Sequence, residues 1–416
     1  MQSTRGMHDI LPKETQYWQY IYQIALENLN IASYQEIRTP IIEDQSLFLR
    51  SIGEHTDIVN KEMYNFTDRA GRYLTLRPEG TAAIARSIIQ HKLCSQKQVQ
   101  RLWYMGPMFR YERPQHGRQR QFHQLGIECY GSTSPAMDAQ IIYLADNILK
   151  NLQCSQYTIE LNSIGSLENR KKYEINLRDY LKTYYNDLSS ESKSRFKNST
   201  IKLLDSKDKH LQEILSEGPQ ITSVLSSASL KHLEEVRECL SNMGVSYIIN
   251  PKLVRGLDYY NDTVFEVKTS LLGTQDTICG GGRYDTLTSQ LGYEAIPAVG
   301  WGMGLERLLL LVQKNLLLDT EKIYFYIATY GQGTINYALS LIPLFQEGKF
   351  KYEIDFSTST LRKQIQKAQK KEAKICLLIG DNEIKNQSIT VKWLNEYKQV
   401  TYSKDNFIAM VTSLSI

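Results

Sequence analysis

The spacing of hydrophobic residues predicts where helices and strands lie in the first half of the chain. Residues 14–32 carry apolar side chains at helical spacing, which predicts an amphipathic helix. Residues 36–43 (EIRTPIIE) predict a short strand that Pro40 confines to an edge or a bend. Residues 99–112 and 122–131 are strand-like runs on either side of a polar loop, which indicates a long-looped β-hairpin.

The pattern becomes helical over residues 166–243, which are rich in Lys, Ser, Glu and Leu and predict a helical insertion. Strand-like character returns in residues 253–267 and 275–285. The run GWGMG at 300–304 is interpreted as a glycine-rich turn that opens a helix over 305–314.

The last hundred residues alternate strand and helix patterns, with helices expected near 334–346 and 360–372. Such alternation is typical of a small α/β domain with helices packed against a sheet. We therefore expect two domains, 1–320 and 321–416, the first of which contains the helical insertion.

Composition narrows the class of protein. The 416 residues are 42% hydrophobic and 23% charged, as expected for a folded globular protein and not for a disordered or collagen-like chain. The net charge of +4 is too small to indicate a partner. The six cysteines lack metal-ligand or redox spacing, the first residues lack the apolar core of a secretory signal, and no window is apolar enough to span a bilayer. We expect a soluble cytoplasmic protein with no membrane partner and no dedicated metal site.

The predicted hairpin is the richest source of candidate chemistry. Strand alternation places Arg110 and Glu112 on one face of the first strand, and Gln124, Gly126 and Glu128 on one face of the second. This face is either a ligand site, in which Gly126 leaves room for the ligand, or the solvated side of an antiparallel sheet. The hairpin loop adds four groups suited to phosphates: Arg113, His116, Arg118 and Arg120.

A strand-to-helix turn carries Glu79, Gly80 and Thr81 ahead of a helix predicted over 81–93. The carboxylate and the hydroxyl suit either a helix cap, which the sequence slightly favours, or a site for a ligand ammonium group.

Two further arginines stand where an anion is expected. Arg255 lies among apolar residues, where it needs either an internal partner such as Asp258 or a ligand phosphate or carboxylate. If this segment is a regular strand, only one of Tyr259 and Tyr260 faces the same side as Arg255. Arg307 opposes the dipole at the start of its helix, so it requires a nearby anion, either Glu306 or a ligand.

The C-terminal domain carries a stripe of lysines at helical spacing, which suits either contact with an RNA backbone or simple solvation of a helix face. Its members are Lys363, Lys367, Lys370, Lys371 and Lys374, opposite an apolar stripe of Leu361, Ile365 and Ala368.

Taken together, these motifs resemble the class II aminoacyl-tRNA synthetases, and among them the histidyl-tRNA synthetase family. EIRTPIIE resembles the first class II motif, FRYERPQHGRQRQFHQLGIE the second and GMGLERL the third. LVRGLDYY and GGGRYD resemble the two histidine-specific signatures of the family, and LRPEGTA resembles its substrate-binding turn. The resemblance implies an α+β catalytic domain built on an antiparallel β-sheet, with a helical insertion, followed by a C-terminal α/β anticodon-binding domain.

The resemblance also implies an activity: ATP-dependent attachment of L-histidine to tRNA(His) through a histidyl-adenylate. It makes Arg110, Arg255 and Arg307 the catalytic residues, with Glu112 and Phe122 also binding ATP. The implied histidine site comprises Glu79, Gly80, Thr81, Gln124, Glu128, Tyr259, Tyr260 and Tyr284. Arg113 and Arg118 would contact tRNA, Mg²⁺ would arrive bound to ATP, and the chain would form a homodimer through its first motif.

Local departures from the family pattern affect packing more than charge. Ser33 precedes Tyr34 where a glycine is usual, Trp301 and Gly302 replace the usual Phe and Ala, and His116 replaces a frequent lysine.

Two other functions fit part of the pattern. A histidine-sensing regulatory subunit of ATP phosphoribosyltransferase resembles this core but lacks the C-terminal domain and the catalytic arginines. An RNA-binding module without catalysis would explain the lysines and leave the pocket residues unexplained.

Overall fold

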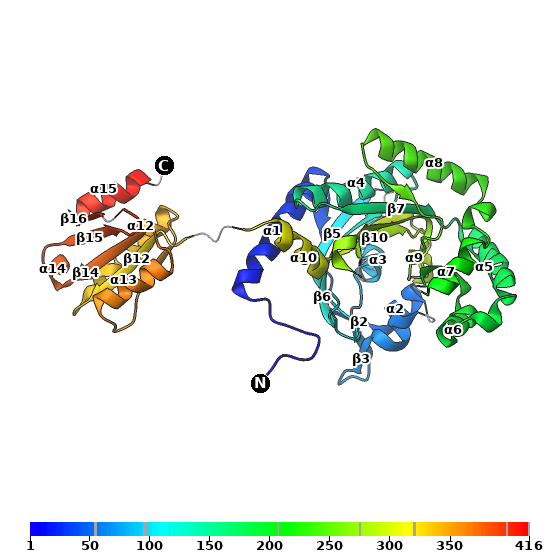
Figure 1. Ribbon diagram of the computed structural model, residues 1–416, viewed down its shortest axis with the longest axis horizontal. Helices are drawn as coiled ribbons and strands as arrows, with labels where there is room; N and C mark the ends of the chain where they lie inside the picture. The colour runs from blue at the N-terminus through cyan, green and yellow to red at the C-terminus, as the bar shows by residue number, and fades with distance from the viewer. Residues whose placement is uncertain are drawn as a thin grey trace. The chain divides into compact units, whose positions relative to one another are not determined.

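The computed structural model describes residues 1–53, 56–94, 98–115, 117–206, 208–273, 276–318, 322–396 and 398–414. The chain divides into two compact units, Met1–Leu317 and Leu318–Ile416 (Figure 1). The boundary expected from the sequence, between residues 320 and 321, lies just after this division. No helix among the described residues is long and apolar enough to cross a membrane.

The first unit is built on an eight-stranded sheet with the order β1-β5-β6-β11-β10-β9-β7-β8. Its six inner strands are antiparallel, and the short outer strands β1 and β8 pair in parallel with their neighbours. The bounds, in sheet order, are Gln35–Glu36, Gln100–Phe109, Gln121–Tyr130, Ala298–Gly304, Thr277–Arg283, Asn261–Thr269, Tyr157–Ser163 and Ile248–Ile249. The hairpin predicted from alternation is the pair β5–β6.

The glycine-rich run at 300–304 is part of the inner strand β11 and is not the turn expected from the sequence. β11 pairs with β6 on one side and β10 on the other, so these glycines lie in the middle of the sheet. Helix α10 (Leu305–Asn315) follows directly.

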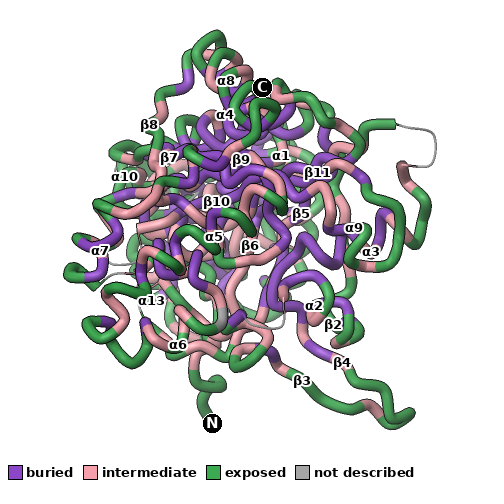
Figure 2. Tube along the Cα trace, turned by 90° about the vertical axis from the view of Figure 1, so that its right-hand side faces the viewer, coloured by how far each residue is buried: buried purple, intermediate pink, exposed green. Residues whose placement is uncertain are grey.

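One face of the sheet is covered by helices α1 (Pro12–Ile31), α4 (Pro135–Asn151), α8 (Ser227–Asn242) and α10. Their apolar stripes bury a single hydrophobic core with the strand residues that point to this side, among them Leu125 and Ile127 of β6. Buried residues accordingly follow the central strands (Figure 2). Because side chains alternate along β6, Gln124, Gly126 and Glu128 point to the opposite face, where the candidate site lies.

The segment 36–43 is not one strand. β1 ends at Glu36 and joins the large sheet, whereas β2 (Ile42–Asp44) belongs to a separate three-stranded sheet with β4 (Tyr73–Leu76) and β3 (Tyr64–Thr67). Pro40 lies between the two strands and has no N–H to donate to a ladder, so the chain changes sheet there. Helix α2 (Gln45–Ile52) and the π-helix η1 (Ile58–Glu62) complete this region.

The expected insertion consists of α-helices and 3-10 turns, and its last helix belongs to the main core. α8 packs against α4 and the sheet through Leu233, Val236 and Leu240. The preceding elements form a second core on the pocket side of the sheet, together with α3 (Thr81–Gln90) and α9 (Leu287–Gln290). They are α5 (Leu167–Lys182), η2 (Tyr185–Asp187), α6 (Ser190–Asn198), η3 (Thr200–Asp205), α7 (Lys209–Ser216) and η4 (Ile221–Val224). A last 3-10 turn, η5 (Ser270–Leu272), follows β9.

The second unit is a five-stranded sheet with the order β13-β12-β14-β15-β16. The strands are Tyr352–Ile354, Phe325–Tyr330, Ile375–Gly380, Ser388–Trp393 and Lys398–Ser403. Its helices are α11 (Thr334–Leu339), α12 (Ile342–Glu347), α13 (Leu361–Lys370), α14 (Asp381–Lys385) and α15 (Lys404–Leu414). The single helix expected near 334–346 is therefore two, and Pro343 lies in the first turn of the second, where proline is tolerated.

Candidate active site

A row of three glycines crosses the sheet beneath the candidate site. Gly126 of β6 pairs with Gly302 of β11, which pairs with Gly280 of β10. The row continues to Tyr104 of β5 at one end and to Glu266 of β9 at the other. Adjacent residues without side chains leave the face of a sheet open for close approach.

The neighbours of the glycines show which part of this row is free. A Cβ at Gly126 would overlap the Tyr104 ring, and a Cβ at Gly280 would overlap the Arg255 guanidinium. At Gly302 the nearest atom would be Nε2 of Gln124, at 3.5 Å. The space that the sequence assigned to a ligand at Gly126 is thus taken by Tyr104, and the open floor lies at Gly302.

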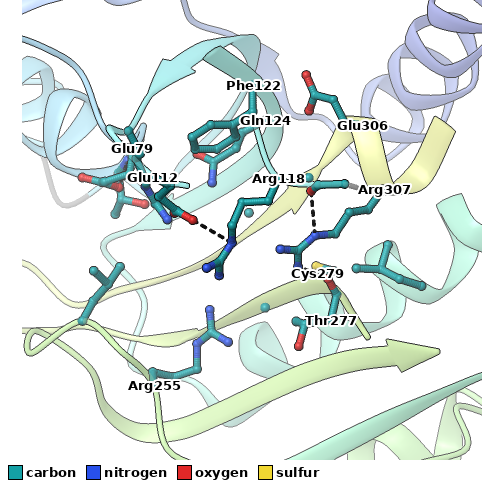
Figure 3. Close-up of a pocket in the computed structure, with 18 of the residues that line it drawn as sticks. Glu79, Glu112, Arg118, Phe122, Gln124, Arg255, Thr277, Cys279, Glu306 and Arg307 are labelled. Atoms are coloured by element: carbon teal, nitrogen blue, oxygen red, sulfur yellow. Dashed lines mark hydrogen bonds and ion pairs between the residues drawn. The ribbon is translucent and has the colours of Figure 1, made fainter. Parts of the chain in front are cut away.

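Most of the residues singled out in the sequence surround one pocket above this floor (Figure 3). From the expected set, the lining contains Glu79, Thr81, Arg110, Glu112, Arg118, Phe122, Gln124, Arg255, Tyr259, Tyr260 and Arg307. Gly80, Arg113, Glu128 and Tyr284 are not part of the lining, and His116 falls outside the described residues. Lining residues that sequence reasoning missed include Tyr104, Gln119, Thr277, Cys279 and Glu306. Alternation along β5, which places Tyr104 on the same face as Arg110, was the available signal for Tyr104, whereas alternation along β10 assigns Cys279 to the core face.

Positive charge converges in the pocket. The guanidinium groups of Arg118, Arg255 and Arg307 point into the same space (Figure 3). Burial, followed by the proximity of Arg118, lowers the pKa of Arg307. Arg118 is exposed and pairs with Glu112, whereas Arg255 and Arg307 are partly buried. Cations brought together in this way favour an anionic ligand, whose charge would relieve their repulsion.

Backbone carbonyls and neighbouring side chains orient the arginines. Nε of Arg110 donates to the carbonyl of Pro78 at 2.9 Å, and its guanidinium carbon lies 5.2 Å from the centre of the Phe122 ring. Nη1 of Arg307 donates to the carbonyl of Thr277 at 2.6 Å. Glu306, one of the two anions that the sequence left open for Arg307, accepts a hydrogen bond from the backbone N–H of His123 at 2.9 Å.

Arg255 pairs with Glu266 of β9 and not with Asp258. Asp258 is held by the insertion, where Arg170 and Lys202 lie 3.5 and 3.3 Å from its carboxylate. Burial acts to lower the pKa of Arg255, but Glu266 and the neighbouring tyrosines raise it above its usual value, so the guanidinium stays charged.

The segment that carries Arg255 is irregular, because β9 begins only at Asn261. The strand expected from residue 253 is therefore wrong in its first part. Without strand alternation, Tyr259 and Tyr260 can both line the pocket, with their ring centres 4.7 Å apart. Both side chains are buried.

Glu79 caps a helix and also faces the pocket. Its two carboxylate oxygens accept hydrogen bonds from the backbone N–H groups of Thr81 and Ala82, at 2.7 and 2.8 Å, at the start of α3. Burial nevertheless raises the pKa of Glu79. The cap that the sequence favoured is present, and the same carboxylate lines the pocket.

Glu128 is fully buried behind two hydroxyl groups. Thr81 Oγ1 donates to one carboxylate oxygen at 2.8 Å, and the Tyr284 hydroxyl donates to the other. Burial, with Glu79 nearby, raises the pKa of Glu128 well above its usual value. Glu128 therefore borders the pocket through Thr81.

The lysine stripe of the second unit is partly neutralised. Lys367 lies 3.0 Å from Asp355, and Lys371 lies 2.6 Å from Glu353. Lys374 follows the end of α13 and lies over the ring of Tyr324. Two of the five lysines of the stripe are thus paired with carboxylates.

Comparison with known proteins accounts for both units. Residues 6–308 match the family described as "Histidyl-tRNA synthetase", and residues 325–414 match "Anticodon binding domain". The chain belongs to the histidyl-tRNA synthetase family. This synthetase is 50% identical over 414 residues to the chloroplastic histidine–tRNA ligase of Gracilaria tenuistipitata var. liui, covering 100% of this chain and 98% of the relative. It is 47% identical over 408 residues to the histidine–tRNA ligase of Cyanothece sp. (strain PCC 7425 / ATCC 29141), covering 98% and 95%.

Solved structures agree with this assignment. The apo histidyl-tRNA synthetase of S. aureus is 32% identical to this synthetase and superposes with a TM-score of 0.82, covering 99% of each chain. The fold class expected from the sequence, an α+β catalytic unit with a separate C-terminal anticodon-binding unit, is confirmed. The fold is shared with a structure from Bacillus halodurans C that is described as an ATP phosphoribosyltransferase regulatory subunit/histidyl-tRNA synthetase. That chain is 22% identical, has a TM-score of 0.67, and the match covers 91% of this chain and 98% of that one.

Proposed function

We propose that this pocket activates L-histidine with ATP and then transfers the histidyl group to tRNA(His). The observation that carries the proposal is the convergence of Arg118, Arg255 and Arg307 over the open floor at Gly302, with Arg110 in the same lining. The full-length identity to histidine–tRNA ligases supports the same activity, which makes the chain a class II aminoacyl-tRNA synthetase. The regulatory alternative has no support, since the arginines and the C-terminal unit are both present.

The first step joins two anions, the histidine carboxylate and the α-phosphate of ATP. Fixed cations lower the barrier where negative charge develops on the phosphate oxygens. Arg110 would hold the α-phosphate, Arg255 would bridge that phosphate and the carboxylate, and Arg307 would hold the γ-phosphate. Phe122, beside Arg110, would stack on the adenine, and Glu112 would contact the adenine side.

The histidine substrate would lie at the end of the pocket formed by α3 and β6. Glu79, Thr81 and Gln124 would take its ammonium group. Oε1 of Gln124 is buried and has no hydrogen-bond partner among the described residues, so an acceptor is available for an N–H of the ligand. Gly80 would help here indirectly, because its lack of a side chain admits the ring of Tyr104.

Two polar groups would recognise the imidazole. Tyr260 lines the pocket directly, whereas Glu128 is reached only when the Thr81 or Tyr284 hydroxyl moves aside, because these two hydroxyls occupy its oxygens. Tyr259 would complete the wall. A competing amino acid without the imidazole nitrogens would leave these buried groups unpaired, which is a strong form of discrimination.

Magnesium is expected to arrive with ATP. The carboxylates of the pocket are already engaged, Glu79 by helix N–H groups and Glu112 by Arg118 at 2.6 Å. Because Mg²⁺ usually binds through substrate phosphates and water with few protein carboxylates, the phosphates would be its main ligands.

The remaining partners follow from the two units. Arg113 and Arg118, in the loop of the β5–β6 hairpin, would contact the acceptor end of the tRNA, and the second unit would bind the anticodon. A homodimer through the segment that contains β1 and β2 is part of the proposal. A cytoplasmic location stays a prediction, because the algal relatives are chloroplastic ligases.

The test is exchange of labelled pyrophosphate into ATP in the presence of histidine. We expect exchange by the wild-type protein and a loss of roughly a hundredfold or more in Arg255→Ala, as when one stabilising donor is removed from a transition state. Histidine binding, measured by calorimetry, should weaken far less. Arg237→Ala is the matched control, since it removes a half-buried arginine of α8 that pairs with Glu234 and donates to the Tyr247 hydroxyl, outside the pocket lining. Pure, folded protein that shows no exchange would contradict the proposal.

A further inference from the structure

The orientation of Arg255 depends on side chains, because its backbone has no regular structure. The residue lies in the irregular segment between β8 and β9. A long arginine side chain carries about 2 kcal/mol of rotamer entropy, so it needs contacts to hold it in one direction. Nε of Arg255 is buried without a hydrogen-bond partner among the described residues, which leaves the other nitrogens to fix the group.

Glu266 supplies the main contact from a rigid part of the fold. It lies on β9, an inner strand, and its register partner on β10 is Gly280, the residue over which the Arg255 guanidinium lies. One carboxylate oxygen pairs with Nη1 of Arg255. The other accepts a hydrogen bond from the Thr277 hydroxyl at 3.3 Å. The Glu266 carboxylate is therefore held at both oxygens. Arg255 lines the pocket (Figure 3), whereas Glu266, which holds the guanidinium, is not part of the lining.

An alternating line of charges supports Glu266 from behind. Lys268 lies 3.4 Å from Glu266 and 2.9 Å from Glu160, the register partner of Glu266 on β7. Two carboxylates directly opposite one another on neighbouring strands would repel, and Lys268 neutralises that repulsion. The line Glu160–Lys268–Glu266–Arg255 thus runs across the sheet and ends at the pocket, and only its last member lines the pocket.

We propose that Glu266 is the positioning residue for Arg255: its carboxylate holds the guanidinium flat over Gly280 and directed into the pocket. The inference rests on the proposed function, in which Arg255 bridges the histidine carboxylate and the α-phosphate. Without Glu266, Arg255 loses its carboxylate partner and retains its contact with the Tyr260 ring, which leaves the guanidinium less restrained. The geometry needed in the transition state is then populated less often, and a misplacement of about 1 Å costs as much as a hundredfold in rate.

Pyrophosphate exchange in Glu266 variants tests this role, with rates divided by the fraction of active sites measured in an adenylate burst. We expect kcat to fall about tenfold in Glu266→Gln, which keeps a hydrogen-bond acceptor, and up to a hundredfold in Glu266→Ala, with smaller changes in KM for ATP. Glu160→Gln is the matched control, because it also removes one carboxylate from Lys268 but does not contact Arg255. Its exchange rate should stay within about threefold of wild type.

A double-mutant cycle separates positioning from an independent effect. If Glu266 acts through Arg255, then Glu266→Ala adds little to Arg255→Ala. An equal fold-loss in both backgrounds would overturn the inference, and so would faster exchange in Glu266→Gln, since Glu266 would then hold Arg255 away from the substrate. Failure of the proposed function looks different: the wild-type protein itself would show neither exchange nor histidine binding, and the inference would fall with it.

Discussion

Gly280→Ala is a small substitution that should separate activity from stability. A methyl group at this position would overlap the guanidinium of Arg255, which lies flat on the strand at Gly280. The overlapping atoms are the far end of a flexible side chain, so the fold can absorb the methyl by moving Arg255. β10 is an extended strand at this position, so alanine requires no strained backbone.

The structure sets the size and sign of both effects. Replacing glycine by alanine where the backbone permits it stabilises a protein by about 0.4–1 kcal/mol, because the unfolded chain loses freedom. The displaced guanidinium must move by about 1 Å, which corresponds to a loss of up to a hundredfold in rate. A hundredfold loss equals about 2.7 kcal/mol of transition-state stabilisation. The variant should therefore melt at the same or a higher temperature while exchanging pyrophosphate far more slowly.

The control is Gly280→Ala in the Arg255→Ala background, where the added methyl group has no guanidinium to displace. The three atoms nearest to that methyl group in the wild-type protein all belong to Arg255. We expect the double variant to exchange pyrophosphate within about threefold of Arg255→Ala alone. An equal fold-loss in both backgrounds, with the proteins folded, would refute the idea that Gly280 sets the position of Arg255.

Two further predictions concern the buried cluster around Glu128. Thr81→Val keeps the shape of the side chain but removes the hydroxyl that donates to Glu128, so the free energy of unfolding in urea should fall by about 1–3 kcal/mol, whereas an unchanged value would contradict the bond. Burial raises the pKa of Glu128 well above its usual 4.5. At a pH between the usual pKa of the unfolded chain and the raised pKa of the folded protein, the folded protein binds more protons than the unfolded chain, so its stability falls as pH rises. Glu128→Gln should remove this dependence on pH, so the unfolding free energy of the variant relative to wild type should rise between about pH 5 and pH 8. Parallel curves of unfolding free energy against pH for the two proteins would show that the Glu128 carboxyl group is not responsible.

Local patterns predicted those features that depend on a few neighbouring residues. The alternation in residues 99–131 predicted the β5–β6 hairpin and placed Gln124 and Glu128 on the pocket face, because side chains alternate along any strand. The apolar stripe in residues 14–32 predicted α1 for the equivalent reason in a helix. The charged motifs likewise indicated the family, because each is a short contiguous run and their order along the chain is a property of the sequence.

Patterns failed where the outcome depends on distant parts of the chain. The three glycines in the run at 300–304 are typical of a turn, yet pairing with β6 and β10 makes the run an inner strand. The partner of Arg255 is Glu266, which lies eleven residues further along the chain, on β9. Asp258, which is nearer in the sequence, pairs instead with Arg170 and Lys202 of the insertion. Composition alone also did not show that α8 belongs to the main core.

The sequence by itself determined the kinds of chemistry available: arginines for anions, glycines for close approach, tyrosines and carboxylates for a polar amino acid. The tertiary structure alone decided how they are combined. The register of five strands places Tyr104, Gly126, Gly302, Gly280 and Glu266 in one row, so a ring fills one end of the floor, a guanidinium covers the other, and the middle stays open. Such a row joins residues up to 198 positions apart in the chain (104 to 302), and no local pattern contains the register that aligns them.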